Sequence, residues 1–409
     1  MTEQINTPEL RFPEFSSEWE ENQLSKLTQL LKDGTHGTHK DVENGAWLLS
    51  AKNIKNNNIT FDESDRKISY ADYHKIYKNY QLQKNDLLLS IVGTIGRTAL
   101  VKDPINLAFQ RSVAIIRFEN RLSKLFFLYL FQTHTFKKKL LRNQVVSAQP
   151  GLYLGDLGKF FVNYPLNYKE QEKIGSFFSK LDQQIELEEE KLKLLEQQKR
   201  GYMQKIFSRE LRFKDENGND YPDWKLKKLS NIADIIGGGT PSTKKSEYWD
   251  GDINWFSPVE IGDKEFVSTS QRRITEKGLE KSSAKMLPIG TVLFTSRAGI
   301  GKTAILSKEA TTNQGFQSIV PKENDLDSYF LYSMTSILKR NAEKVGAGST
   351  FSEVSRKQME QIKLLIPILK EQKQIGRLFQ IINRKINKQI HKIELLKQRK
   401  KGLLQKMFV

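Results

Sequence analysis

Residues 169–175 read KEQEKIG, and residues 370–376 read KEQKQIG, at an offset of 201 residues in a chain of 409. The match continues at this offset, without a gap, to the end of the chain. The tripeptide LRF at 10–12 also recurs at 211–213, again 201 residues later. A repeat on this scale decides the architecture before any local pattern does. The sequence therefore predicts two related halves.

Outside these segments the two halves match more weakly, after an insertion of four residues. The aligned positions are Trp19 with Trp224, Gly34-Thr35 with Gly239-Thr240, GTIGRTALV at 93–101 with AGIGKTAIL at 298–306, and Pro165 with Pro367. Each half is thus a variable block of about 150 residues followed by a closely matched segment of about 40. Such blocks share a skeleton but differ in most side chains, which is typical of two related recognition modules with different targets.

The matched segments have the apolar spacing of long helices. Apolar residues recur at steps of three and four in 168–207 and again in 369–408, with polar gaps at Glu188 and Lys199, and at Gln389 and Lys400. Nearly five heptads without an internal proline favour coiled-coil helices. The other interpretation is that each helix lies separately on a globular core.

Charge favours pairing of the two helices. Residues 166–208 carry eight basic and eight acidic side chains, with an acidic run over 186–190. Residues 367–409 carry twelve basic and two acidic side chains. An antiparallel pair that crosses near residues 188 and 388 would place acid against base, and we expect this arrangement.

Composition limits the class of protein. Lys and Arg number 66 against 48 Asp and Glu, a net charge of +18, which favours a polyanionic partner such as nucleic acid, or else an acidic protein. Ten of these charges lie in the second helix, so the case for DNA rests on the repeat. With no cysteine there is no disulfide and no thiolate nucleophile. The longest apolar run, LFFLYLF at 125–131, is shorter than a membrane span, and the polar start MTEQINTPEL is no signal peptide, so we expect a soluble cytoplasmic protein.

The variable blocks have mixed patterns that favour an α+β fold. Expected strands are 87–92, 98–101 and 112–118 in the first block, and 291–296, 303–306 and 318–320 in the second. Helical stretches are expected around 123–141 and 327–341.

Two motifs resemble chemical sites but lack key features. Gly301-Lys302-Thr303 ends like a phosphate-binding loop, yet Ser296 stands where that motif needs glycine, and the first block has Arg97 in place of the lysine. The histidines of GTHGTH at 34–39 suggest a metal, but the aligned loop GGGTPST at 237–243 has none. We therefore expect no metal, no bound cofactor and no catalytic residue in this chain.

The same loops carry side chains suited to DNA. Hydroxyl groups and cations suit phosphates, Asn and Gln suit adenine, and Arg suits guanine. The candidate DNA-binding residues are Thr35, His36, Arg97, Gln110, Arg111, Thr240, Ser242, Arg297, Lys302, Gln314 and Gln317. Ordinary turn and strand-end polarity is the other interpretation.

The whole chain resembles the specificity subunit of type I restriction-modification enzymes. The resemblance is carried by Gly238-Gly239-Thr240-Pro241-Ser242, by YWDGDINW at 248–255, by SRAGIGK at 296–302 and by the helices that open on Lys-Glu-Gln. The first block departs from the pattern, because Gly34-Thr35-His36 is followed by no proline.

This resemblance implies two pseudo-repeated target-recognition domains joined by two long antiparallel coiled-coil helices. The domains would be 1–165 and 209–366, and the helical spacers 166–208 and 367–409. Each domain would read one half of a split, asymmetric site in double-stranded DNA. The helices would dock two methyltransferase subunits, which bind S-adenosylmethionine, and the full complex would add two motor-nuclease subunits that use ATP and Mg²⁺. A DNA-reading subunit of a fused type II-like enzyme, and a coiled-coil protein scaffold, remain open as alternatives.

Overall fold

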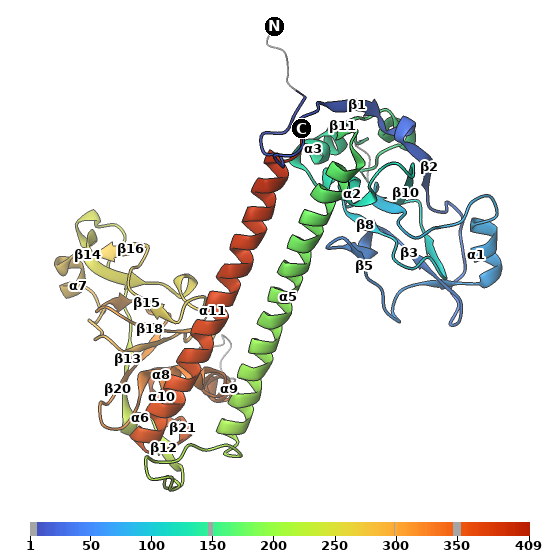
Figure 1. Cartoon of the computed structure of the whole chain (residues 1–409). Helices are drawn as coiled ribbons and strands as arrows, with labels where there is room; N and C mark the ends of the chain where they lie inside the picture. The colour runs from blue at the N-terminus through green and yellow to red at the C-terminus, as the bar shows by residue number, and fades with distance from the viewer. Residues whose placement is uncertain (1–5, 146–149, 298, 347–352) are drawn as a thin grey trace. The chain divides into compact units, whose positions relative to one another are not determined.

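The computed structural model describes residues 6–145, 150–297, 299–346 and 353–409. The chain forms two compact units, each made of one globular block and one part of each long helix (Figure 1). The first unit comprises Met1–Glu190 with Ile390–Val409, and the second comprises Lys191–Gln389. Both mix helices with mainly antiparallel sheets, so the α+β fold class predicted from the sequence is confirmed.

The block of the first unit is built on a four-stranded sheet of order β2-β10-β7-β8 and a three-stranded sheet of order β6-β3-β9. Its strands are β1 (Trp19–Gln23), β2 (Thr28–Asp33), β3 (Ala46–Leu49), β4 (Ile54–Lys55), β5 (Asn58–Ile59), β6 (Lys67–Ile68), β7 (Leu87–Ser90), β8 (Thr98–Leu100), β9 (Leu107–Phe109), β10 (Val113–Phe118) and β11 (Phe161–Pro165). Its helices are α1 (Tyr70–Ile76), α2 (Lys124–Leu130), α3 (His134–Arg142) and α4 (Leu154–Gly158).

The block of the second unit repeats this plan, with a five-stranded sheet of order β13-β20-β17-β18-β15 and a three-stranded sheet of order β16-β14-β19. Its strands are β12 (Lys225–Lys228), β13 (Ala233–Gly237), β14 (Trp249–Phe256), β15 (Phe266–Val267), β16 (Arg272–Ile274), β17 (Val292–Phe294), β18 (Thr303–Leu306), β19 (Thr311–Thr312), β20 (Gln317–Pro321) and β21 (Lys363–Ile366). Its helices are α6 (Leu229–Ile232), α7 (Glu276–Glu280), α8 (Ser328–Ser333), α9 (Thr335–Gly346) and α10 (Arg356–Gln361).

The six strands expected from sequence all occur, but each expected helical stretch is divided in two. In the first block α2 ends before Thr133, whose side chain accepts a hydrogen bond from the amide of Phe136 and so caps α3. A threonine in this role satisfies one of the amides that lack a partner at a helix start. Apolar spacing does not register such a break, because both short helices bury residues in the same core.

The two long helices are α5 (Tyr168–Phe207) and α11 (Leu369–Lys406). In the first unit Phe178 contacts Phe408, Asp182 pairs with Lys400 and Glu188 pairs with Lys392. Partner numbers fall along α11 as they rise along α5, so the helices run antiparallel, as predicted. The same relation brings Phe207 against Phe379 in the second unit.

Acid meets base along the first unit's part of the helix pair, as expected. Glu188 pairs with Lys392, about one helical turn beyond residue 388, and Glu189 lies 2.6 Å from Lys397. The apolar contacts set this register, because Ile174, Phe178 and Ile185 are buried, and burying one such side chain stabilises the fold by about 1.5–3 kcal/mol. Partly exposed ion pairs contribute less.

Each long helix ends in the core of the block other than the one that precedes it in the chain. Phe408, near the end of α11, packs on Trp19, Phe126 and Phe178 in the first unit. In the second unit the end of α5 has the same role, and Phe207 packs on Trp224, Phe330 and Phe379. The four aromatic residues of the first unit thus correspond, one by one, to the four of the second unit in the repeat.

The Lys-Glu-Gln motif fastens each helix start to its block through a buried carboxylate. Glu170 is fully buried, and both its oxygens accept hydrogen bonds from Arg11, at 2.7 and 2.8 Å. Glu371 is likewise fully buried and accepts from Arg212 at 3.2 and 2.8 Å. The LRF and KEQ repeats are therefore two sides of one contact.

The glutamine of the motif is fully buried as well. Gln171 accepts a hydrogen bond from the amide of Ser123 and donates to the carbonyl of Pro165. Gln372 accepts from the amide of Asp327 and donates to the carbonyl of Pro367. The repeated prolines thus mark where the last strand of each block meets the long helix.

Candidate nucleic-acid interface

A tight turn between β7 and β8 presents Arg97 in the first unit. The hydroxyl of Ser90 donates to the carbonyl of Thr94 at 2.6 Å and accepts from the amide of Arg97 at 2.8 Å. Gly96 has a φ of +89°, in the left-handed region that glycine adopts without a steric penalty. The hydroxyl of Ser90 and the left-handed Gly96 therefore fix the backbone of this turn, and the guanidinium of Arg97 extends from a rigid backbone.

The turn between β17 and β18 has the same construction in the second unit. The hydroxyl of Thr295 donates to the carbonyl of Gly299 at 2.7 Å and accepts from the amide of Lys302 at 2.9 Å. Gly301 has a φ of +93°. Lys302 is exposed and stands at the position of Arg97. Ala298, which belongs to the SRAGIGK motif, lies outside the described residues.

Two further loops lie at the same edge of the first unit's sheet. Asp33 at the end of β2 pairs with Ala114 of β10, whose first residue pairs with the last residue of β7. The amide of Thr35 donates to the carbonyl of Phe109 at 2.7 Å, and the amide of Arg111 donates to the carbonyl of Thr35 at 3.0 Å. Thr35, Gln110 and Arg111 are therefore direct neighbours, and His36 follows them. Arg97 lies along the same edge, roughly 10–15 Å away at usual strand spacing.

The second unit gathers its candidates at the matching edge. The hydroxyl of Thr240 donates to the side-chain oxygen of Gln314. Ser242 and Gln314 are exposed, whereas Gln317 is a partly buried strand residue whose Oε1 finds no hydrogen-bond partner. Arg297 is partly buried and its Nε lies 4.0 Å from Glu353. Gln317 is therefore the least accessible of these residues to DNA.

In each unit a glycine of one edge loop lies close to the backbone of the neighbouring loop, and this contact corrects the alignment of the two halves. A Cβ added to Gly34 would lie 2.0 Å from the carbonyl oxygen of Phe109, and one added to Gly238 would lie 2.0 Å from that of Asn313. Both glycines allow a close backbone contact that no side chain permits. Gly34 therefore corresponds to Gly238, not to Gly239, and His36 corresponds to Thr240. The shared Gly-Thr pair misled the sequence alignment by one residue.

Two tryptophans hold the loop 237–243 of the second unit. The indole of Trp255 donates to the carbonyl of Gly239 at 2.8 Å, and that of Trp249 donates to the carbonyl of Ser242 at 3.1 Å. The guanidinium of Arg272 lies 3.6 Å from the ring centre of Trp249. The YWDGDINW stretch thus supports the loop that carries Thr240.

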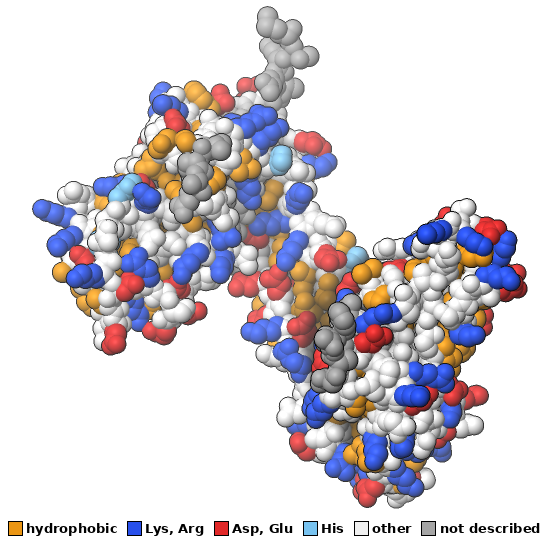
Figure 2. Space-filling model, turned by 180° about the vertical axis from the view of Figure 1, so that it is seen from behind, with side chains coloured by type: hydrophobic (Ala, Val, Ile, Leu, Met, Phe, Trp, Pro, Cys, Tyr) orange, Lys and Arg blue, Asp and Glu red, His pale blue; other side chains and the backbone are white. Residues whose placement is uncertain are grey.

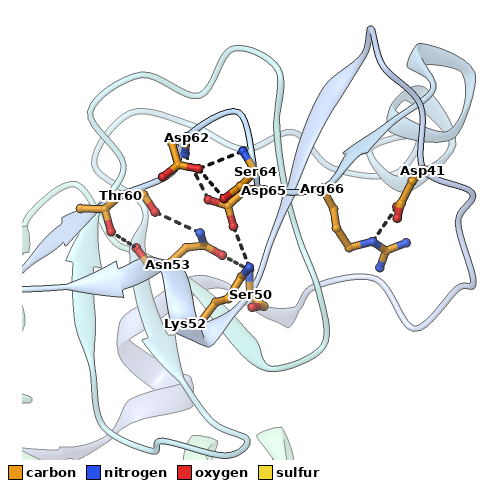
Figure 3. A network of polar contacts seen from close by, with 9 residues as sticks. All are labelled: Asp41, Ser50, Lys52, Asn53, Thr60, Asp62, Ser64, Asp65 and Arg66. Atoms are coloured by element: carbon orange, nitrogen blue, oxygen red, sulfur yellow. Dashed lines mark hydrogen bonds and ion pairs between the residues drawn. The ribbon is translucent and has the colours of Figure 1, made fainter. Parts of the chain in front are cut away.

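In the first unit the corresponding loop is held by polar contacts. His39 bonds through Nε2 to the hydroxyl of Thr35 at 3.0 Å, and His36 pairs with Asp33 at 2.5 Å. Arg66 donates to Asp41 at 2.6 Å and to the carbonyl of His39 at 2.8 Å. Figure 3 shows Arg66 reaching toward Asp41 from the segment 60–66.

That segment is itself fixed by a network of carboxylates and amides (Figure 3). Asn53 donates to the carbonyl of Thr60 at 3.0 Å, and Asp62 accepts from the amide and hydroxyl of Ser64. Asp65 pairs with Lys52 at 2.8 Å. This bond, together with one from Asn53, lowers the pKa of Asp65 from 3.8 to about 2.

Sequence reasoning missed a basic helix beside each cationic turn. A Cβ on Gly96 would lie 3.8 Å from Lys137 of α3, and one on Gly301 would lie 2.5 Å from Lys339 of α9. Burial lowers the pKa of Lys137, and the nearby Lys400 lowers it further. The run HTFKKKLLR at 134–142 was the available signal. Figure 2 shows Lys and Arg side chains spread over the visible face of each unit, with acidic side chains among them.

Comparison with known proteins agrees with this repeated geometry. The family described as the type I restriction modification DNA specificity domain matches residues 16–197 and again residues 221–397. The chain belongs to this family. One specificity domain lies in each half, and each match spans a globular block and most of the helix that follows it.

Relatives of these specificity domains come from archaea and bacteria. The MjaIX type I specificity subunit of Methanocaldococcus jannaschii is 38% identical over 174 residues, 42% of this chain, and the match spans only 40% of that protein. A chain from the same organism that carries the name of the MjaX specificity subunit is 23% identical over 409 aligned positions, covering 96% of this chain and 93% of its own length. The S subunit of a type I system from M. genitalium shares the fold, with a TM-score of 0.64 at 15% identity, over 98% of this chain and 99% of its own.

The phosphate-binding interpretation of one specificity-domain loop fails on geometry. Gly301-Lys302-Thr303 joins two antiparallel strands, whereas a phosphate-binding loop of that motif joins a strand to a helix. Within the described ranges, no group of three or more His, Asp or Glu side chains could hold a metal ion. Among the helices that the structure describes, none is long and apolar enough to cross a membrane.

Proposed function

We propose that this chain is the DNA-sequence specificity subunit of a type I restriction-modification complex and has no catalytic centre of its own. One half of a bipartite, asymmetric site is read by each block. One observation carries this proposal: in each unit hydroxyl, amide and cationic side chains line one sheet edge, on equivalent rigid loops, yet the side chains differ. Because the loops are equivalent but carry different side chains, the two units can bind DNA in the same way and still recognise two different half-sites.

The roles within each edge follow from chemistry. Arg97 and Lys302 stand on matched turns and suit phosphate contacts, which position the protein without reading sequence. Arg111 suits a guanine edge and Gln314 an adenine edge, because their donor and acceptor patterns fit the major groove. Neither turn nor loop needs to move, since their backbones are already fixed.

The helices supply a second surface, for partner subunits. Leu194 of α5 and Leu395 of α11 occupy the same repeat position and are 58% and 51% exposed. Because these exposed leucines lie at equivalent positions on the two helices, each helix could bind one copy of the same partner protein. We infer that two methyltransferase subunits dock there and that two motor-nuclease subunits complete the assembly. S-adenosylmethionine, ATP and Mg²⁺ would bind to those partners.

Methylation mapping tests the reading function. The full chain would be produced in cells with its cognate methyltransferase, and methylated motifs found by long-read sequencing. We expect a split motif in which Arg111→Ala relaxes only one half and Gln314→Ala only the other, each by ~1–3 kcal/mol per base contact. Lys302→Ala should weaken methylation at all sites alike.

The full chain is preferable to a truncation at residue 208. Removing the first block would expose Met407 and Phe408, which are buried in its core. A wild-type chain that yields no split motif would favour a protein scaffold instead. Relaxation of both halves by one substitution would contradict the assignment of one half-site to each unit.

A further inference from the structure

The seam is the line of α5 and α11 residues that face one another, and it carries polar side chains at Asp182 and Asn383. These two residues occupy the same repeat position, 201 residues apart. Lys400 and Lys199 form a second repeat pair. In the first unit Asp182 pairs with Lys400 at 2.6 Å. Asn383 is only 6% exposed in the second unit.

In the first unit this pair is bound to the globular block. The amide of Asn57 donates to Asp182 at 2.7 Å, and the hydroxyl of Tyr129 donates to the same oxygen at 3.0 Å. Lys400 also donates to Gln132 at 3.2 Å. Three side chains, two from the block and one from α11, thus converge on one carboxylate of α5.

Asn57 lies at the tip of a two-residue hairpin between β4 and β5. Asn56 and Asn57 have φ values of +48° and +61°, the left-handed pair that a type I′ turn requires. The hydroxyl of Thr98 donates to the other end of the Asn57 amide, at 3.4 Å. The hairpin therefore holds Asn57 in one orientation, pointing at the helix pair.

The second unit has an equivalent cluster in which the charges are exchanged. Tyr329 donates to Glu265, a loop residue just before β15, at 2.7 Å, and accepts from Asn383 at 3.0 Å. Burial lowers the pKa of Lys199, while the negative charges of Glu265 and of Glu196 on α5 oppose this shift. Both clusters thus combine lysine, tyrosine, carboxylate and amide side chains. The carboxylate that accepts from the tyrosine stands on the helix in the first unit and on the block in the second.

We propose that these two clusters orient each block on its own part of the helix pair, with Asn57 and Glu265 as positioning residues for the DNA half-sites. The opposite placement of the carboxylate makes each block fit only its own helix position. Carboxylates on both sides would place two anions beside one lysine, and amides on both sides would leave that lysine unpaired. This inference rests on the proposed reading of a bipartite site.

The test is a charge exchange in the second unit of the full chain, produced with its cognate methyltransferase. The readout is methylation of sites whose two halves are separated by the native spacer, or by one base pair more or less. Asn383→Asp should lower the preference for the native spacer about tenfold, because a tilted block no longer meets its half-site. Asn383→Asp combined with Glu265→Gln reproduces the polarity of the first unit and should restore the preference.

Asn387→Asp is the matched control, because it makes the same substitution one turn further along α11 at an exposed position. Melting temperatures would be measured for every variant. If Asn383→Asp does not fold, Glu265→Gln alone should still lower the spacer preference roughly threefold, since it removes the negative charge that Tyr329 and Lys199 face. The mirror pair in the first unit is Asp182→Asn with Asn57→Asp.

Four results would be decisive. An unchanged spacer preference in Asn383→Asp, or a double variant no better than the single one, would overturn the positioning role. Equal loss in the Asn387→Asp control would also overturn it. A wild-type chain that methylates no split motif would instead overturn the proposed function on which the inference rests.

Discussion

The two helix junctions are built from the same residues, whereas the two sheet edges are not. At the junctions, Arg11 with Glu170 and Arg212 with Glu371 form nearly superimposable contacts. At the edges, Arg111 and Gln314 stand at equivalent places on equivalent loops. The two halves therefore have the same residues where a buried contact constrains the side chain, and different residues where the side chains face outward. Four predictions test this comparison.

The largest effect is expected at the buried carboxylates. Glu170→Gln should destabilise the first unit by about 3–5 kcal/mol, because it leaves Arg11 without its countercharge in a buried place. Glu371→Gln should cost the second unit less, since Glu170 also accepts from Trp19 at 3.3 Å whereas the indole nitrogen of Trp224 has no hydrogen-bond partner. Unit-resolved hydrogen exchange would measure both, and equal effects would show that the junctions are equivalent in energy as well as in sequence.

The helix ends come next. Phe408→Ala should cost roughly 3 kcal/mol, because Phe408 is 6% exposed and packs on three aromatic rings. Phe207→Ala is the matched variant in the second unit, and it should cost less because Phe207 is only partly buried. Thermal denaturation followed by hydrogen exchange would separate the units. A loss in Phe408→Ala that is confined to the second block, which precedes α11 in the chain, would contradict the packing of Phe408 in the first unit.

An acid-dependent difference is expected for Asp65. Its pKa falls from 3.8 in the unfolded chain to about 2 in the fold, so its ionised form stabilises the first unit. This contribution is present above about pH 4 and is lost as the pH falls toward 2. Asp65→Asn should therefore be less stable than wild type at pH 7 but similar near pH 2. A constant difference across urea denaturation curves at these pH values would count against the role of the charge.

The smallest effect is expected on the helix surface. Glu189→Lys should destabilise the first unit by about 1 kcal/mol or less, because both partners of the Glu189–Lys397 pair are about half exposed. Lys397→Glu in addition should recover part of the loss and identify the pair. A melting temperature that responds to neither change would mean that apolar packing alone sets the register.

The sequence predicted the repeat, the long helices and their direction, because these depend on identities and spacings that can be read directly. It did not predict the break at Thr133, since apolar residues continue at helical spacing on both sides of the polar stretch QTHT at 132–135. It misaligned Gly34 by one residue, because the close contact with Phe109 is formed by a backbone distant in sequence. The candidate residues at the loops remain predictions, as their roles depend on DNA. The exchange of charge between the two clusters could not be read from sequence: Asp182 and Asn383 align on the helices, but their block partners Asn57 and Glu265 lie in loops that do not align.

The packing of Phe408 on Trp19 sets an order of events during synthesis. The second unit, residues 191–389, has all its parts once residue 389 has left the ribosome. The first unit is begun earlier but lacks Leu404, Met407 and Phe408 until residue 408 has been translated. The half that is made first is therefore the half that closes last, and until then its unfilled core is open to premature aggregation.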